Sequence, residues 1–131
     1  MIKYSLYIID DEKSISDYLP LSFEDDYHVK AFPCADDALN AMQKTLPDLI
    51  LLDIGLPGMN GIEALEKIKT LSVETVVIMT TAYEDVPTVV AAMKHGAYDY
   101  VVKPLHMDSL EVSVRNGLET IRLRKEVKVL Q

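Results

Sequence analysis

The chain has 131 residues, which suits one domain with a single core, and its 49% hydrophobic and 26% charged residues are ordinary for a globular protein. The net charge of −8 argues against direct nucleic-acid binding, because a phosphate-binding surface needs clustered Lys and Arg; the alternative is that the charge only aids solubility. The chain has a single cysteine, Cys34, which cannot form an internal disulfide and so favours a reducing compartment. The sequence has no apolar run of membrane length and no signal-peptide pattern, so we expect a cytoplasmic protein without membrane contact.

Short apolar runs alternate with amphipathic stretches along the first half of the chain. Residues 4–10, rich in β-branched and aromatic side chains, predict a strand. The next stretch has an apolar stripe at helical spacing, formed by Ile15, Tyr18, Leu19 and Phe23. Pro20 lies within this stripe and is expected to kink or shorten the helix.

A weaker strand is expected at residues 27–32, followed by a helix over 35–45. Asp36 and Asp37 lie in the first turn of that helix, where the helix dipole favours anions. The continuous apolar run at 48–53 predicts a strand that is buried on both faces.

The second half repeats the pattern. Asn60 is expected to cap a helix with Glu63 as its capping-box partner, and residues 75–81 predict the fourth strand. Asp85 and Pro87 suit the start of a fourth helix, which ends near Gly96. A fifth strand at 98–103 and a helix from Asp108 onward complete the chain.

Five strands that alternate with five helices predict an α/β fold with a parallel, doubly wound sheet. The loops that follow the strands then gather at the carboxyl edge of the sheet, where such folds bind their ligands.

Several polar residues stand at these strand ends: Asp10 and Asp11, Asp53, Thr80 and Thr81, and Lys103 before Pro104. Three carboxylates close together repel one another and call for a cation, and oxygen ligands of this kind suit Mg²⁺. The Lys103 ammonium and the Thr81 hydroxyl can bind the oxygens of a phosphoryl group. A rigidly held carboxylate such as Asp53 can attack the phosphorus of that group as a nucleophile and so accept it.

The segments "YIIDDE", "DLILLDIGLPGMNGIEAL", "VVIMTTA" and "MKHGAYDYVVKPL" together resemble the receiver domain of bacterial two-component response regulators, over about residues 4 to 122. The resemblance implies a flavodoxin-like fold with strand order 2-1-3-4-5. It also implies a phosphorylation-activated switch that is not an enzyme in the usual sense, although it assists its own phosphoryl transfer and dephosphorylation.

By this resemblance, Asp53 is the phosphoacceptor for a sensor histidine kinase. The Mg²⁺ site is then formed by Asp10, Asp11, Asp53 and the backbone carbonyl of Gly55.

The resemblance also assigns the remaining motif residues. Lys103 pairs with the acyl phosphate, and its bond to Pro104 is expected to be cis. Thr81, which precedes Ala82, is the switch hydroxyl, and Tyr100 is the aromatic residue that turns inward with it.

The end of the chain, residues 119–131, continues the last helix with an apolar stripe between charges. It is either a single exposed helical tail or a coiled-coil linker that joins two copies. We expect a receiver domain at 1–122 and the start of a linker to an absent output domain at 123–131. The run "AYDYVVKPL" and this tail resemble nitrogen-regulation-type transcriptional activators that work with an alternative sigma factor, which implies a homodimer through the fourth and fifth helices and the linker.

Other interpretations remain open for single residues and for the whole chain. Each proposed site residue other than Asp53 also has a purely structural interpretation, as a helix cap, a packing residue or a solvated surface residue: Asp10, Asp11, Thr81, Lys103 and Tyr100. A phosphatase with an aspartyl-phosphate intermediate and a degenerate, protein-binding receiver are the alternative functions. The histidines and Cys34 are interpreted as structural or surface residues: His28, His95 and His106 lack a ligand partner at helical spacing.

Overall fold

The computed structural model describes residues 2–82 and 86–130. Five strands alternate with five helices in these segments. The strands are β1 (Ser5–Ile9), β2 (His28–Phe32), β3 (Leu49–Asp53), β4 (Val76–Thr81) and β5 (Asp99–Val102). The helices are α1 (Lys13–Phe23), α2 (Ala35–Met42), α3 (Gly61–Leu71), α4 (Val86–Lys94) and α5 (Met107–Leu130).

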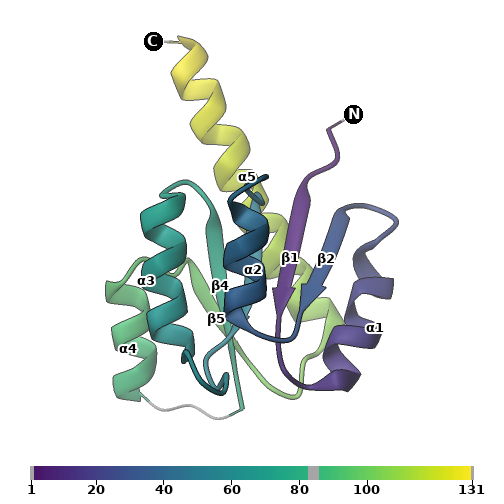
Figure 1. Ribbon diagram of the computed structural model, residues 1–131. Helices are drawn as coiled ribbons and strands as arrows, with labels where there is room; N and C mark the ends of the chain where they lie inside the picture. Colours follow the sequence, from purple (N-terminus) through teal and green to yellow (C-terminus); the bar gives the residue numbers. More distant parts are fainter. Residues whose placement is uncertain (1, 83–85, 131) are drawn as a thin grey trace.

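The strands form one parallel sheet in the order β2-β1-β3-β4-β5, which confirms the predicted fold and strand order. Helices α2, α3 and α4 lie on one face of the sheet, and α1 and α5 lie on the other (Figure 1). All the strands run in one direction, so the loops that follow them meet at a single edge, at the bottom of Figure 1.

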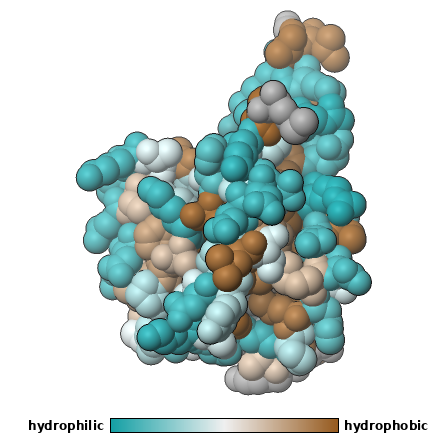
Figure 2. Space-filling model, turned by 90° about the vertical axis from the view of Figure 1, so that its right-hand side faces the viewer, coloured by the Kyte–Doolittle hydropathy of each residue, from teal (hydrophilic) through white to brown (hydrophobic). Residues whose placement is uncertain are grey.

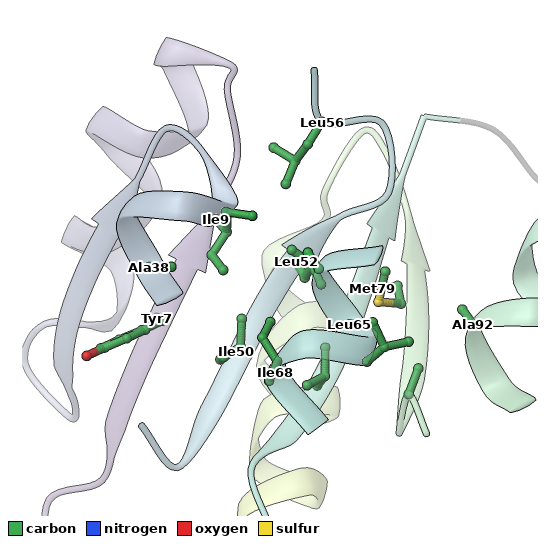
Figure 3. Packing of buried hydrophobic residues seen from close by; sticks show 14 of the residues in the cluster. Tyr7, Ile9, Ala38, Ile50, Leu52, Leu56, Leu65, Ile68, Met79 and Ala92 are labelled. Atoms are coloured by element: carbon green, nitrogen blue, oxygen red, sulfur yellow. The ribbon is translucent and has the colours of Figure 1, made fainter. Parts of the chain in front are cut away.

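Two apolar layers hold the helices against the sheet. One packs side chains of β1, β3 and β4 against α2, α3 and α4, and Figure 3 shows Ile50, Leu52 and Leu65 near its centre. The other packs the opposite face of the same strands against α1 and α5. Every residue of β3 and β4 is buried, as expected for strands covered on both faces, and this burial fixes where their polar end residues lie.

Helix α1 departs from its predicted pattern in two ways. The helix continues past Pro20 to Phe23, so of the two expected effects of the proline, a kink or a shortening, the shortening does not occur. Leu19 and Phe23 are buried, but Tyr18 is 69% exposed and does not belong to the core stripe. Burial of the large Phe23 ring against the sheet favours the last turn of the helix despite the amide hydrogen that proline lacks.

The predicted start of α3 is confirmed. The backbone N–H of Glu63 donates to the Asn60 side-chain oxygen over 3.0 Å, and the Asn60 amide donates to the Glu63 carboxylate over 3.2 Å. Helix α4 is described from Val86, with Pro87 in its first turn, and the proposed cap Asp85 lies outside the described residues. The predicted end at Gly96 agrees with its φ of 101°.

Helix α5 is much longer than its neighbours, with 24 residues. Its buried positions end at Ile121, and the remaining turns project beyond the edge of the sheet opposite to the strand-end loops (Figure 1). Within the described residues, no helix is long and apolar enough to cross a membrane.

Candidate functional site

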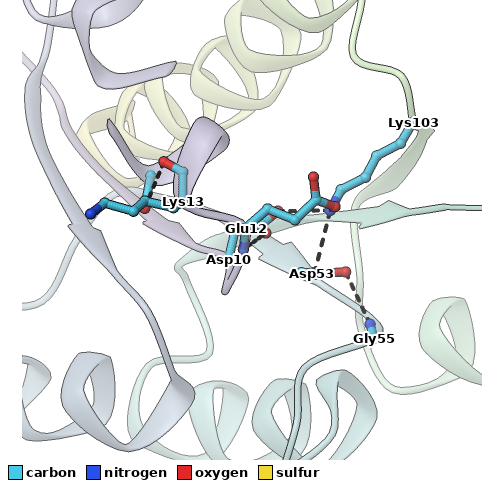
Figure 4. A network of polar contacts seen from close by, with 7 residues as sticks. Asp10, Glu12, Lys13, Asp53, Gly55 and Lys103 are labelled. Carbon is cyan, nitrogen blue, oxygen red and sulfur yellow. Dashed lines mark hydrogen bonds and ion pairs between the residues drawn. The ribbon is translucent and has the colours of Figure 1, made fainter. Parts of the chain in front are cut away.

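Four strand ends bring their polar residues to one place at the carboxyl edge of the sheet. Asp53 is the last residue of β3 and Thr81 the last of β4, while Asp10 and Lys103 directly follow β1 and β5. Figure 4 shows the Lys103 side chain reaching from the end of β5 toward Asp10, Glu12 and Asp53. The convergence expected from the strand order is therefore present in the structure.

The three aspartates form a compact acidic cluster. Asp10, Asp11 and Asp53 each offer a carboxylate oxygen within 4.8 Å of the others. Asp10 and Asp53 are buried, whereas Asp11 is exposed. Burial raises the pKa of Asp10 and the charge of Asp53 adds to this, although hydrogen bonds from the Glu12 backbone and Lys103 act in the opposite direction. The charged form of Asp10 is thus disfavoured mainly because the carboxylate is buried.

Lys103 supplies the only positive charge recorded in contact with this cluster among the described residues. Its ammonium lies 3.0 Å from Asp10 and 3.4 Å from Asp53. A third carboxylate, that of Glu12, lies closer, at 2.8 Å. Burial alone would lower the pKa of Lys103, but its hydrogen bonds to Glu12 and Asp10 and the neighbouring charges raise that pKa above its ordinary value. The lysine is therefore held in its charged form.

The loop after Asp53 fixes the orientation of its carboxylate. The backbone N–H of Gly55 donates to Asp53 Oδ1 over 3.0 Å, and the N–H of Ile54 donates to the Thr80 carbonyl over 2.9 Å. Gly61 then brings the start of α3 against this loop, where an added Cβ would come within 2.5 Å of the Ile54 backbone. A glycine is required at this close approach, because a side chain there would collide with the backbone that follows Asp53.

The two proposed switch residues lie on neighbouring strands, Thr81 at the end of β4 and Tyr100 in β5. Thr81 is buried at the strand end, and its carbonyl accepts a 2.6 Å hydrogen bond from the N–H of Lys103. Tyr100 is half-buried and packs against the apolar layer that includes Ala92 of α4. The peptide bond between Lys103 and Pro104 is cis.

An open depression of about 420 Å³, which we call the acid pocket, lies at this edge of the sheet. Its lining is formed by Asp11, Glu12, Asp53, Ile54, Gly55, Thr81, Ala82, Thr88 and Lys103. The three clustered aspartates, with one ammonium beside them, offer the oxygen ligands that a hard divalent cation prefers, so the residues present fit Mg²⁺.

Two members of the pocket were not singled out from the sequence. Glu12 directly follows the acidic pair, and its position in the loop after β1 was the available signal. Thr88 lies in the first turns of α4, and nothing in its sequence context distinguishes it from an ordinary helix residue.

Comparison with known proteins identifies the family. Residues 6–115 match the family described as the response regulator receiver domain. The chain belongs to that family. Receiver domains are phosphoacceptor switches that receive phosphate from sensor kinases and generally bind Mg²⁺ at an acidic pocket, and they control transcriptional output in regulators of the kind matched here.

The relatives of this receiver domain include regulators of the predicted type. NtrX of Azorhizobium caulinodans, a nitrogen assimilation regulatory protein, is 40% identical over 131 residues, which are 98% of this chain and 29% of that protein. The regulatory protein AtoC of Escherichia coli is 35% identical over 130 residues, 95% of this chain and 27% of AtoC. The likeness to nitrogen-regulation-type activators is thereby confirmed.

Solved structures agree with this placement of the receiver domain. NtrX from Brucella abortus, in complex with ADP, superposes with a TM-score of 0.91 at 32% identity, covering 99% of this chain and 30% of that one. A CheY-like receiver domain protein from Methanospirillum hungatei superposes with a TM-score of 0.90 at 28% identity, and the match covers 94% of this chain and 99% of that one. The chain thus spans less than a third of the regulators it resembles.

Proposed function

We propose that Asp53 is the phosphoacceptor of this receiver domain and that a phosphohistidine of a sensor kinase is the donor. The single observation that carries the proposal is the position of Asp53. Its carboxylate is held by Gly55 and Lys103 at a strand end, yet it lines an open pocket. A rigid carboxylate that a donor can reach is what in-line phosphoryl transfer requires.

In the proposed reaction an Asp53 carboxylate oxygen attacks the phosphorus, the phosphorus–nitrogen bond of the donor breaks, and the imidazole leaves with a proton. Lys103 neutralises charge on the oxygens of the transferring group from its place beside Asp53. Mg²⁺, when bound, would neutralise further negative charge on the transferring group. It would be held by Asp10, Asp11, Asp53 and the carbonyl of Gly55. Attack of water on the same acyl phosphate then returns the domain to its starting state.

The output of the switch is proposed to pass through Thr81 and Tyr100. The acyl phosphate attracts the Thr81 hydroxyl, Tyr100 turns inward, and the surface formed by α4, β5 and α5 changes. We propose that residues 1–122 form the receiver unit, that 123–131 begin a helical linker to an output domain, and that two copies associate through α4, α5 and this linker. The exposed apolar side chains of the linker support this arrangement: Leu123, Val127, Val129 and Leu130.

The proposal is tested by incubating the protein with acetyl phosphate and Mg²⁺ and measuring its intact mass. We expect one stable phosphoryl adduct, lost in Asp53→Asn and retained in Asp25→Asn, which removes an exposed acid at the turn after α1. Continuous release of phosphate without an adduct would instead favour the phosphatase, and no adduct under any condition would favour a degenerate receiver. Either result would overturn the proposal.

A further inference from the structure

The ammonium group of Lys103 is fully engaged before any phosphoryl group arrives. An ammonium has three N–H donors, and Lys103 has three carboxylate partners. The shortest contact, 2.8 Å, is to Glu12 rather than to either aspartate. A phosphoryl oxygen on Asp53 that pairs with Lys103 must take the place of one of these three contacts.

The three partners differ in how firmly they are held. The side chains of Asp10 and Asp53 are 3% and 8% exposed, and each accepts a second hydrogen bond from a backbone N–H, of Glu12 and Gly55 respectively. The Glu12 side chain is 53% exposed, and within the described part of the chain its carboxylate contacts only Lys103. Glu12 is therefore the partner that is displaced at the lowest cost.

The location of Glu12 gives its side chain somewhere to go. Glu12 and Lys103 line the acid pocket, and they also line an apolar groove of about 570 Å³ that contains Ile15 and Tyr18 of α1 and Leu105 after β5. The Glu12–Lys103 ion pair thus lies on the boundary between these two depressions. Because the Glu12 side chain is half exposed, its carboxylate can turn out of the acid pocket toward solvent or the groove.

We infer that Glu12 is a positioning residue that restrains Lys103 in the unphosphorylated domain and must release it when Asp53 carries a phosphoryl group. This inference rests on the proposed function of Asp53. The same carboxylate adds negative charge at the rim of the pocket, which opposes an anionic donor and an acyl phosphate. Glu12 therefore disfavours the phosphorylated state in two ways, by occupying the lysine and by repelling the incoming group.

The test compares Glu12→Gln and Glu12→Ala with the wild-type domain. Both variants are expected to take up phosphate from acetyl phosphate about two- to fivefold faster, the range expected when a half-exposed ion pair is removed. Both are also expected to bind beryllofluoride with Mg²⁺ at a proportionally lower half-saturating concentration. Asp17→Asn removes one exposed charge from α1, the helix that follows Glu12, and controls for a general effect of net charge; it should change both quantities little.

A second measurement, made without Mg²⁺ and without a donor, reports on Lys103 itself. The ¹⁵N-detected signal of its ammonium group is expected to shift in both Glu12 variants and to stay in place in Asp17→Asn. Unchanged or slower phosphorylation in both Glu12 variants, or an unchanged Lys103 signal, would overturn the inference. Failure of the wild-type domain to accept phosphate would instead overturn the proposed function of Asp53, so the two failures are distinguishable.

Discussion

Asp10 carries a charge that the folded protein tolerates poorly when no cation is bound. Its pKa is raised above the ordinary 3.8 by burial, so the folded state binds more protons than the unfolded state just above that pH. The stability of the domain therefore falls as pH rises through this window, and the cost of the charged Asp10 persists at neutral pH. A divalent cation in the acid pocket would offset that cost.

Asp10→Asn should accordingly stabilise the cation-free domain at pH 7, by about 1 kcal/mol, since it removes a buried charge and keeps the side-chain shape. Urea unfolding in the presence of a chelator measures the gain, which should shrink as pH falls toward 3.8. Added Mg²⁺ should stabilise the wild-type domain more than the variant. Asp11→Asn, at an exposed position, should give a smaller gain, and a loss of stability in Asp10→Asn would contradict the argument.

At the level of single residues, most of the candidate site could be predicted from the sequence. The order of the acidic pair, Asp53, Thr81 and Lys103 along the chain was sufficient to predict that they meet, because the carboxyl ends of parallel strands share one edge. Glu12 could not be assigned a role in this way. Its contact with Lys103 depends on side-chain directions in a loop, and an exposed glutamate after a strand is common on any protein surface.

At the scale of elements, the position of Asp53 depends on how closely α3 approaches the end of β3. An added Cβ at Gly61 would lie 2.7 Å from the Asp53 carbonyl and 2.5 Å from Ile54 Cα, and backbone atoms cannot yield as a flexible side chain can. At Gly55 the nearest atom would be 3.7 Å away, which is ordinary contact. Gly55 in the loop after β3 thus has room for a Cβ, whereas Gly61 at the start of α3 does not.

Gly61→Ala should therefore destabilise the domain by about 2 kcal/mol or more and lower the rate of phosphorylation by acetyl phosphate, because the loop that orients Asp53 must shift. Gly55→Ala is the matched control and should unfold at nearly the wild-type urea concentration. Equal stability of the two variants would show that α3 can move without disturbing β3.

Element boundaries were predicted less well than element order. The apolar runs located every strand, since burial on both faces leaves a strong hydrophobic signal in β3 and β4. Helix α1 extends past Pro20 because the packing of Phe23 outweighs a local preference, and Tyr18 shares the helical spacing of the core residues but faces outward. Local sequence does not record which side of such a stripe the sheet covers.

On the scale of the whole molecule, α5 extends well beyond the part of the core that it helps to form. All its buried residues lie at or before Ile121, and beyond that point Arg124 and Lys128 contact Glu74 at the surface. A chain that ends at residue 122 should keep its fold, with little change in its thermal unfolding midpoint. Loss of cooperative unfolding in that shortened chain would place the domain boundary within 123–131 instead.

The projecting end of α5 also leads to a prediction about association. Leu123, Val127 and Leu130 recur at helical spacing and are exposed, and Figure 2 shows apolar side chains at the tip of the molecule. A single helix gains nothing by exposing such a stripe, whereas a second copy can bury it. Because each copy carries a net charge of −8, the two bodies repel one another, so added salt should strengthen the pairing.

Sedimentation velocity of residues 1–131 should therefore show a monomer–dimer equilibrium that shifts toward dimer from low to moderate salt. Two variants should remain monomeric under the same conditions: the double variant Val127→Asp and Leu130→Asp, which keeps only Leu123 of the stripe, and the chain that ends at residue 122, which has none of it. Beryllofluoride with Mg²⁺ should change the dimer fraction if the surface of α4, β5 and α5 contributes to the contact. A dimer that persists in the shortened chain and in the double variant would move the interface from the linker to the body of the domain.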